Sequence, residues 1–272
     1  MPEGDAVWRA ARRLHEAFAG AVLTRTDFRW PSLATTTLVG ARTLEVVPRG
    51  KHLLHRVEVT GRATLDGAWT IHSHFRMDGT WRVSATTTPP QRFGRHTVRA
   101  VLATEASTAV GDSLGMLDVV RTTDEGRLVG HLGPDLLGAD WDADRAAANL
   151  AAASGTIGEA LLDQRHLAGL GTIWTAETLF AQRLDPWTPA SDLTPAQLGA
   201  LVDRAHRLLK AAIGPRRPEH HVYRRLHQPC RRCGTPITAG TIGTPPQERI
   251  LFFCPRCQDR ARPSSNRAAS VT

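Results

Sequence analysis

Four cysteines near the end of the 272-residue chain have the spacing of metal ligands. They form two pairs, Cys230 with Cys233 and Cys254 with Cys257, with two residues inside each pair and 20 between the pairs. Two such pairs can hold one tetrahedral Zn²⁺, and the stretch between them has the length of a β-hairpin. Free thiols and two disulfides are the alternatives, but the paired spacing disfavours the first and an intracellular chain disfavours the second. Because four protein ligands complete the coordination, the sequence predicts a structural zinc.

The N-terminus offers a candidate nucleophile. Removal of Met1 would leave the secondary amine of Pro2 as the chain end, with Glu3 beside it. A terminal α-amino group has a pKa of about 8, so an appreciable fraction is neutral near pH 7. Such an amine can attack an electrophilic carbon and form an iminium, while a neighbouring carboxyl group transfers protons. Many chains begin with Met-Pro, so an ordinary terminus is the alternative.

Lysine is rare in this sequence. Of the 34 basic side chains only Lys51 and Lys210 are lysines, and the others are arginines. An ammonium can release its proton and a guanidinium cannot, so Lys51 is a candidate for proton transfer. A GC-rich genome would produce the same bias without any functional cause.

The positive charge is concentrated in the last quarter of the chain. From Arg204 to the C-terminus there are 14 basic and 3 acidic residues, and the whole chain carries +8. This asymmetry favours nucleic acid as the partner, with an anionic membrane surface or a merely solvated face as alternatives. Arg249, five residues before the second cysteine pair, is a candidate phosphate ligand, or simply one exposed arginine among many.

The composition excludes several classes of protein. With 41% hydrophobic and 22% charged residues, the chain is neither disordered nor fibrous. No apolar run approaches the ~18–20 residues that a membrane span requires. The N-terminus carries acidic residues where a signal peptide would carry basic ones, so we expect an intracellular protein.

The elements that must position these residues change type along the chain. Residues 5–19 have the periodicity of an amphipathic helix, and residues 21–121 contain short strands separated by Gly, Pro and Thr. This pattern predicts an antiparallel sandwich or barrel. An alanine-rich part follows, with predicted helices over residues 142–153, 157–164, 172–182 and 195–213. Asp142 and Thr194 are the expected N-caps.

The predicted architecture is α+β and multidomain. It comprises an N-terminal antiparallel β-sandwich with flanking helices, a helical domain and a zinc-finger hairpin. The expected boundaries are residues 1–130, 131–222 and 223–260, followed by a disordered tail over 261–272. Within the helical part, Gly169 and Gly171 open a helix whose N–H groups would suit a phosphate, although close packing explains the glycines equally well.

Taken together, these features resemble the bacterial formamidopyrimidine-DNA glycosylase/endonuclease VIII family of base-excision repair enzymes. The resemblance covers nearly the whole chain in the right order. The segments that carry it are residues 2–4 (Pro-Glu-Gly), 49–51 (Arg-Gly-Lys), 161–171 (the helix–two-turns–helix element) and 230–257 (the zinc finger with Arg249).

The resemblance implies a mechanism. The amine of Pro2 would attack C1′ of the damaged nucleotide and displace the base, with Glu3 as the acid/base group. Lys51 would donate a proton and contact phosphate in the elimination step, and Arg249 would hold the phosphates around the everted nucleotide. The iminium acidifies the neighbouring sugar carbon, so the strand would break by β,δ-elimination. Eversion costs least for a damaged base.

Further DNA contacts follow from the same resemblance. Residues 74–79 are similar to a loop that fills the vacated stack, which makes Met77 the candidate wedge and Arg76 its neighbour. His131 and His96 match positions that touch DNA in the family. The alternating His72 and His74 suggest packing rather than a metal site.

Three departures from the family pattern narrow the choice of branch. Thr172 stands where an asparagine usually follows Gly171, Ala6 replaces an acidic residue, and residues 105–120 contain no Arg-Arg-Phe-Gly-like strand end. The missing strand end, together with the Pro-Glu-Gly start, favours the endonuclease VIII branch and oxidised pyrimidines. A glycosylase for 8-oxoguanine and formamidopyrimidines, a non-catalytic binder of damaged DNA, and a zinc-finger module on an unrelated enzyme are the alternatives.

The resemblance also implies partners. We expect a monomer that binds double-stranded DNA with damaged bases or abasic sites, in the bacterial cytoplasm with the nucleoid. One zinc ion is the expected cofactor, and no membrane contact is expected.

Overall fold

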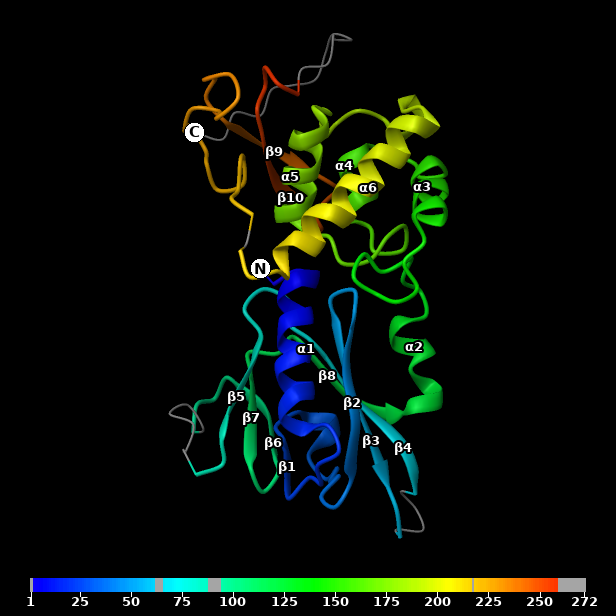
Figure 1. The fold of residues 1–272 in the computed structure, drawn as a ribbon, viewed down its shortest axis with the longest axis vertical. Helices are drawn as coiled ribbons and strands as arrows, with labels where there is room; N and C mark the ends of the chain where they lie inside the picture. The colour runs from blue at the N-terminus through cyan, green and yellow to red at the C-terminus, as the bar shows by residue number, and fades with distance from the viewer. Residues whose placement is uncertain (1, 62–65, 88–93, 217, 259–272) are drawn as a thin grey trace.

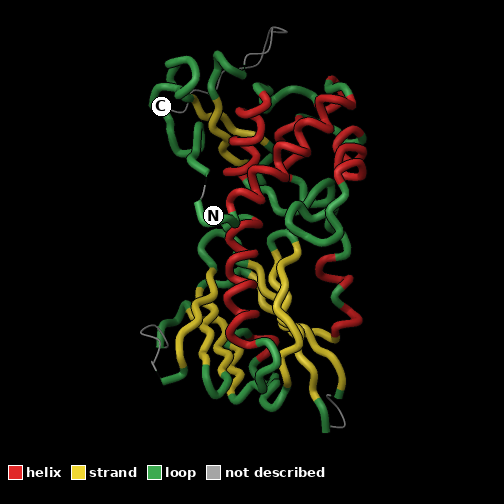
Figure 2. The backbone as a smooth tube through the Cα atoms, viewed as in Figure 1, coloured by secondary structure: helices red, strands yellow, loops and turns green. Residues whose placement is uncertain are grey.

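A computed structural model describes residues 2–61, 66–87, 94–216 and 218–258. Two units are stacked along the long axis of the molecule, with a β-rich unit at one end and helices with a small hairpin at the other (Figures 1 and 2). The N-terminus lies near the junction of the units. Met1 and the predicted tail over 261–272 lie outside the described residues.

The β-rich unit is a sandwich of two four-stranded antiparallel sheets, as the sequence predicted. The first sheet has the order β2 (Arg42–Arg49), β3 (His52–Val59), β4 (Gly67–His74), β8 (Met116–Arg121). The second has the order β1 (Arg25–Phe28), β6 (Val98–Ala103), β7 (Ser107–Asp112), β5 (Thr80–Ala85).

Helix α1 (Gly4–Phe18) packs against the sandwich through one apolar face. Val7, Leu14 and Phe18 are at most 1% exposed and join the sandwich core, where they meet Leu53 and Leu102. Arg12 and Arg13 on the opposite face are exposed, which is the amphipathic pattern expected of this segment, whereas Arg9 is half-buried. Burial of this face fixes the start of the chain over the sandwich.

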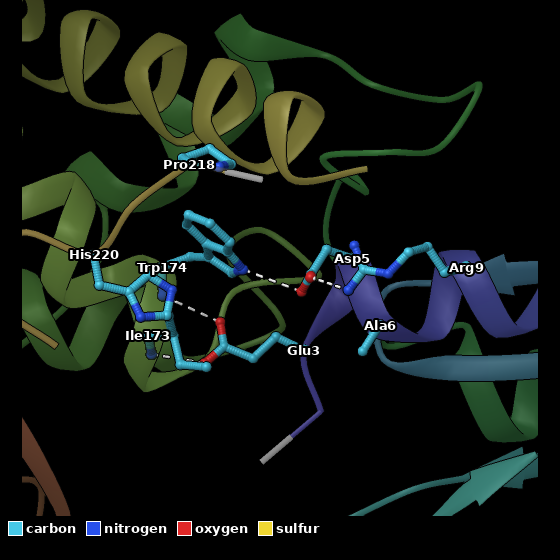
Figure 3. Close-up of a pocket in the computed structure, with 8 residues that line it drawn as sticks. All are labelled: Glu3, Asp5, Ala6, Arg9, Ile173, Trp174, Pro218 and His220. Atoms are coloured by element: carbon cyan, nitrogen blue, oxygen red, sulfur yellow. Dashed lines mark hydrogen bonds and ion pairs between the residues drawn. The ribbon is translucent and has the colours of Figure 1, made fainter. Parts of the chain in front are cut away.

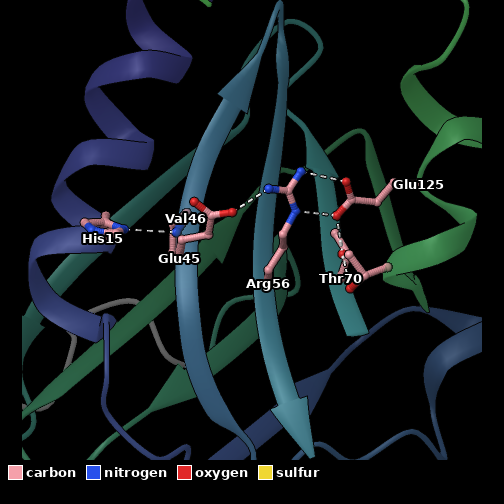
Figure 4. Close-up of polar contacts among 7 residues, drawn as sticks. His15, Glu45, Val46, Arg56, Thr70 and Glu125 are labelled. Atoms are coloured by element: carbon pink, nitrogen blue, oxygen red, sulfur yellow. Dashed lines mark hydrogen bonds and ion pairs between the residues drawn. The ribbon is translucent and has the colours of Figure 1, made fainter. Parts of the chain in front are cut away.

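The opposite face of the first sheet carries a polar network instead of an apolar core (Figure 4). The guanidinium of Arg56 donates two hydrogen bonds of 2.7 Å to Glu125 and a further one to Glu45. Glu125 also accepts from the hydroxyl of Thr70. A two-pronged guanidinium–carboxylate contact is directional. It therefore fastens the segment that leads into helix α2 (Gly126–Val129) onto the sheet.

The helical unit contains four helices around its own core. They are α3 (Ala143–Ala151), α4 (Ile157–Leu162), α5 (Thr172–Gln182) and α6 (Pro195–Ala212). Asp142 caps α3 and Thr194 caps α6, as predicted, while Thr156 caps α4. No helix of the described residues is long and apolar enough to cross a membrane.

A two-stranded hairpin packs on helix α5. Its strands are β9 (Thr238–Ile242) and β10 (Arg249–Phe253), and Pro236, shortly before β9, forms a bridge with Pro229. Leu251 and Ile242 are buried against Phe180 of α5. The hairpin is therefore held by the helical unit as well as by its cysteines.

Candidate active site

Glu3 joins the two units. Its carboxylate accepts hydrogen bonds from the backbone N–H groups of Gly171 (2.8 Å), Ile173 (2.7 Å) and Trp174 (3.2 Å), at the N-terminus of α5. Figure 3 draws Glu3 with Ile173 and Trp174. The side chain comes from 168 residues earlier in the chain and is 1% exposed. Burial raises the pKa of Glu3 to about 7, against the opposing effects of Lys51 and the three N–H donors. Near neutral pH the carboxyl group therefore exchanges a proton readily.

The glycines before α5 are required by this close approach. A Cβ on Gly171 would lie 2.6 Å from the Glu3 carboxylate, and the N–H of Gly4 donates to the carbonyl of Gly169 (2.9 Å). The expectation that the N–H of Gly171 faces a phosphate does not hold in this structure, because the carboxylate of Glu3 takes that place. Thr172 is buried as the first residue of α5, and its contact with DNA stays a prediction.

Lys51 lies on the turn between β2 and β3, where its charge interacts with that of Glu3. Burial lowers the pKa of Lys51 to about 8, an effect that Glu3 opposes and Arg249 strengthens. The turn passes through Gly50 in the left-handed region (φ +57°), where a side chain would also meet Ala168. The structure thus brings together Glu3, Lys51 and Arg249 from three different segments.

Asp135 holds the lysine turn in place, a function that the sequence did not reveal. Its carboxylate accepts the N–H of Gly50 (2.7 Å) and of Leu137 (3.0 Å), and burial raises its pKa. Arg49, the preceding residue of the turn, pairs with the more exposed Asp140 (3.0 Å). The only sequence signal was the position of Asp135 in a predicted break between domains. A buried carboxylate therefore connects the turn of Lys51 to the helical unit.

The four cysteines meet as the sequence predicted. Their sulfur atoms lie within 4.8 Å of one another, and the Sγ–Sγ distances are 3.9 Å for Cys230–Cys257 and 3.5 Å for Cys233–Cys254. Thiolates about 2.3 Å from one tetrahedral ion have similar separations, so this donor set fits a metal ion. Arg249 begins the second strand of the hairpin and donates to the carbonyls of Gln247 and Glu248.

A cavity of about 320 Å³ opens beside Glu3. Its polar wall is built from Asp5, which accepts from Arg9 (2.6 Å) and from the indole N–H of Trp174 (3.1 Å) (Figure 3). His220 stands at the same cavity and meets the ring of Trp174 edge-on. The sequence did not reveal this wall, because it combines segments from both units.

A cluster of histidine rings surrounds His52, the residue that follows Lys51. His52 and His72 are hydrogen-bonded through their rings (2.8 Å), and His72 also contacts Asp118 (2.9 Å). Burial, followed by neighbouring histidines and Lys51, lowers the pKa of His52 to about 3. The ring of His131 lies 6.3 Å and that of His74 4.8 Å from His52. His72 is fully buried, which agrees with the packing role expected of it.

The predicted DNA-contacting loops lie at the same end of the sandwich. Strand pairing places His52 opposite His74, which begins the loop of Arg76 and Met77. Thr80, after this loop, and Val98 both pair with Asp112, so the exposed His96 lies at that end too. Met77 is 60% exposed, and Arg76 has a left-handed backbone (φ +53°). Their contacts with DNA stay predictions.

The site can therefore perform acid–base chemistry next to the chain terminus. Glu3 and Lys51 have pKa values moved toward neutrality from opposite directions, and Pro2 directly precedes Glu3. Such tuning is frequent where proton transfer is catalysed.

Comparisons with known proteins agree with this geometry. The model of the formamidopyrimidine-DNA glycosylase N-terminal domain matches residues 1–133, and that of the H2TH domain of the same enzymes matches residues 132–218. The protein named "Probable endonuclease 8 2" of Streptomyces coelicolor is 48% identical over 270 residues, covering 95% of this chain and 94% of that protein. "DNA-(apurinic or apyrimidinic site) lyase Nei2" of Mycolicibacterium smegmatis is 39% identical, covering 95% and 99%.

Solved structures show the same fold. MutM in complex with DNA containing carbocyclic 8-oxo-G has a TM-score of 0.79 at 21% identity, covering 95% of this chain and all of that one. Lactococcus lactis Fpg with DNA containing an abasic site has a TM-score of 0.78 at 20% identity, with the same coverage. Because the two family models together match most of the sequence in order, the chain belongs to the formamidopyrimidine-DNA glycosylase family.

Proposed function

We propose that this protein is a base-excision DNA glycosylase and abasic-site lyase whose nucleophile is the amine of Pro2. The observation that carries the proposal is the placement of Glu3. A buried carboxyl group with a pKa of about 7 adjoins the terminal residue and borders a cavity at the junction of the two units. A carboxyl group of this kind can both donate and accept a proton at physiological pH.

Each step uses a group of the site. The neutral amine of Pro2 attacks C1′, the C1′–N bond to the base breaks, and the amine proton passes to the departing base. Cleavage of the C1′–O4′ bond then opens the sugar ring and leaves an iminium between Pro2 and C1′. Glu3 protonates the sugar ring oxygen and later accepts a proton. Loss of a proton from the neighbouring sugar carbon then breaks the strand by β,δ-elimination, with Lys51 as proton donor. Arg249 and Lys51 contact the phosphates around the everted nucleotide.

Oxidised pyrimidines are the proposed substrates, in double-stranded DNA bound by a monomer. Relatives named endonuclease 8 reach 48% and 41% identity, whereas a formamidopyrimidine-DNA glycosylase of Gluconobacter oxydans reaches 31%. The absence of an Arg-Arg-Phe-Gly-like strand end from residues 105–120 supports the same branch. The cavity beside Glu3 would receive the base, with Trp174 and His220 at its wall.

One zinc ion held by the four cysteines is the proposed cofactor. Its role is structural, because four thiolates leave no open coordination position. The ion would fix the hairpin, and thereby Arg249, in front of Lys51.

Trapping with borohydride tests the nucleophile. The protein is incubated with a duplex that carries one abasic site, reduced, digested and mapped by mass spectrometry. We expect the adduct on the peptide that begins with Pro2. Lys51→Gln should still give this adduct but cleave the strand more slowly, whereas Lys210→Gln, on the exposed side of α6, serves as the matched control.

An adduct on Lys51, or full activity with Met1 retained, would contradict the proposal. No adduct from a protein that lacks Met1 and still binds the duplex would instead favour a non-catalytic binder of damaged DNA.

A further inference from the structure

A second cavity, of about 470 Å³, lies between α5, α6, the segment over 218–221 and the first cysteine pair. It adjoins the cavity beside Glu3, because Trp174 and Pro218 line both. Apolar side chains such as Leu208 form part of its wall. Three arginines also line it: Arg204, Arg231 and Arg232. No step of the proposed mechanism uses this cavity.

Arg204 is a half-buried cation without a partner. Its Nε is buried and has no hydrogen bond, and no acceptor or carboxylate among the described residues contacts its guanidinium. The buried Nε–H has no hydrogen-bond acceptor within the described part of the chain, and an anion supplied from outside the chain would satisfy it. Its position on α6 at the cavity wall makes it accessible to a ligand there.

The two carboxylates of the cavity are already engaged. Glu177 accepts the backbone N–H groups of His221 (2.8 Å), Val222 (3.0 Å) and Tyr223 (2.9 Å). Glu219 is paired with Arg231. Neither carboxylate is within ion-pair distance of Arg204, so the positive charge of the cavity is left for a ligand.

A second cation and aromatic rings complete the wall. Arg232 donates to the carbonyl of Phe180 (3.2 Å) and its guanidinium lies 4.2 Å from the centre of that ring. The imidazole of His221 stacks on the same ring at 5.6 Å. The packing against Phe180 holds the guanidinium of Arg232 and the ring of His221 in place, so this second cation of the cavity has a fixed support.

We propose that this cavity binds a phosphate monoester attached to a nucleoside, with Arg204 as its principal ligand. A guanidinium matches two phosphate oxygens at once, and the apolar wall accommodates the sugar and base. The phosphate has two sources. One is a free mononucleotide. The other, which rests on the proposed function, is the 5′-phosphate end that β-elimination leaves on the downstream strand, produced at the adjoining cavity.

Calorimetric titration with thymidine 5′-monophosphate and with thymidine tests the site without catalysis. We expect saturable binding of the monophosphate and at least tenfold weaker binding of thymidine. Arg204→Met should weaken binding of the monophosphate at least tenfold. Arg207→Met, three residues further on α6 and paired with Asp203 (3.0 Å) in solvent, is the matched control and should bind as the wild type does.

The same pair of variants distinguishes binding in this cavity from binding in the cavity beside Glu3. Arg204 does not line the cavity beside Glu3, so Arg204→Met should not weaken binding there. Because no hydrogen bond or ion pair of Arg204 is lost among the described residues, Arg204→Met should melt within a few degrees of the wild type. Such a melting temperature would exclude misfolding as the cause of weaker binding.

A gapped duplex identifies the source of the phosphate. If the DNA end is the ligand, a 5′-phosphate at the gap should bind at least fivefold more tightly than a 5′-hydroxyl, and Arg204→Met should abolish the difference. If only the mononucleotide responds to the variant, the free nucleotide is the ligand.

The proposal is overturned if neither probe binds saturably at millimolar concentration, if thymidine binds as well as its monophosphate, or if Arg204→Met binds both probes as the wild type does. Failure of the proposed lyase activity would show separately, as the absence of a borohydride adduct.

Discussion

Two buried glutamates, Glu3 before helix α1 and Glu177 on helix α5, invite comparison because their hydrogen bonds are nearly the same. Glu3 and Glu177 are 1% and 3% exposed, and each carboxylate accepts three backbone N–H groups. Glu3 receives them from the start of α5 itself, whereas Glu177 projects from α5 to the segment over 221–223. One carboxylate thus joins the sandwich to the helices, and the other joins the helices to the hairpin.

Their neighbours differ. Glu3 lies next to Pro2, the proposed nucleophile, and within the electrostatic influence of Lys51, the proposed proton donor. Glu177 has only backbone donors among its hydrogen-bond partners. The comparison teaches that burial and hydrogen-bond number do not make a carboxylate catalytic. The chemical groups that lie next to a buried carboxylate decide whether it can take part in a reaction.

Exchanging each glutamate for glutamine is the sharpest test of this contrast. Glu3→Gln should lower the single-turnover rate of base excision by about 10²–10⁴-fold, since it removes the acid/base group. Glu177→Gln should change the rate per folded molecule less than about threefold. Equal losses in the two variants would break the distinction.

Asp135 provides a third buried carboxylate, and its removal is expected to lower activity by an intermediate factor. Asp135→Ala should slow strand cleavage about tenfold, because the turn of Lys51 loses its anchor at the N–H of Gly50, and small displacements of catalytic groups are costly. Asp140→Ala, which removes only the half-exposed partner of Arg49, should cost less than twofold. Steady-state cleavage of a duplex with an abasic site measures both. Unchanged activity of Asp135→Ala would show that the turn holds its shape unaided.

Glu177→Ala should act on stability and local opening. Three N–H groups around residue 222 lose their acceptor, and one buried unsatisfied group costs about 1–3 kcal/mol. We expect the free energy of unfolding to fall by about 2 kcal/mol and amide exchange over 219–226 to accelerate. If exchange there stays at the wild-type rate while other regions accelerate, Glu177 does not hold this segment.

The pH dependence of stability gives the smallest effect. The pKa of Glu3 is about 7 in the folded protein against an ordinary 4.5, so the folded state keeps a proton that the unfolded chain has lost. Its contribution to stability is therefore full below pH 4.5 and is lost as the pH rises through 7. The Glu3→Gln variant does not lose this contribution. Its free energy of unfolding should therefore rise by about 1–2 kcal/mol relative to that of the wild type between pH 4.5 and 8.

Denaturant unfolding of both proteins at several pH values measures this difference. The buried histidines titrate in both and largely cancel in the comparison. A constant difference across this pH range would mean that Glu3 ionises as readily in the folded protein as in the unfolded chain.

The sequence by itself determined the local elements and the chemistry-bearing residues. Asp142 and Thr194 marked helix starts because capping is a contact within one turn. The cysteine pairs indicated a metal-binding hairpin because ligand spacing is set within a few residues. Glu3 and Lys51 were identified as candidates by residue type and by the family resemblance.

Only the tertiary structure decided how these residues meet. Nothing in the chain near Glu3 indicates that its carboxylate takes the N–H of Gly171, 168 residues away, in place of the phosphate expected there. The same holds for the anchoring of Gly50 by Asp135 and for the unpaired Arg204. Periodicity reports which face of an element is buried, whereas the desolvation and fields that tune a site depend on which distant segments pack against it.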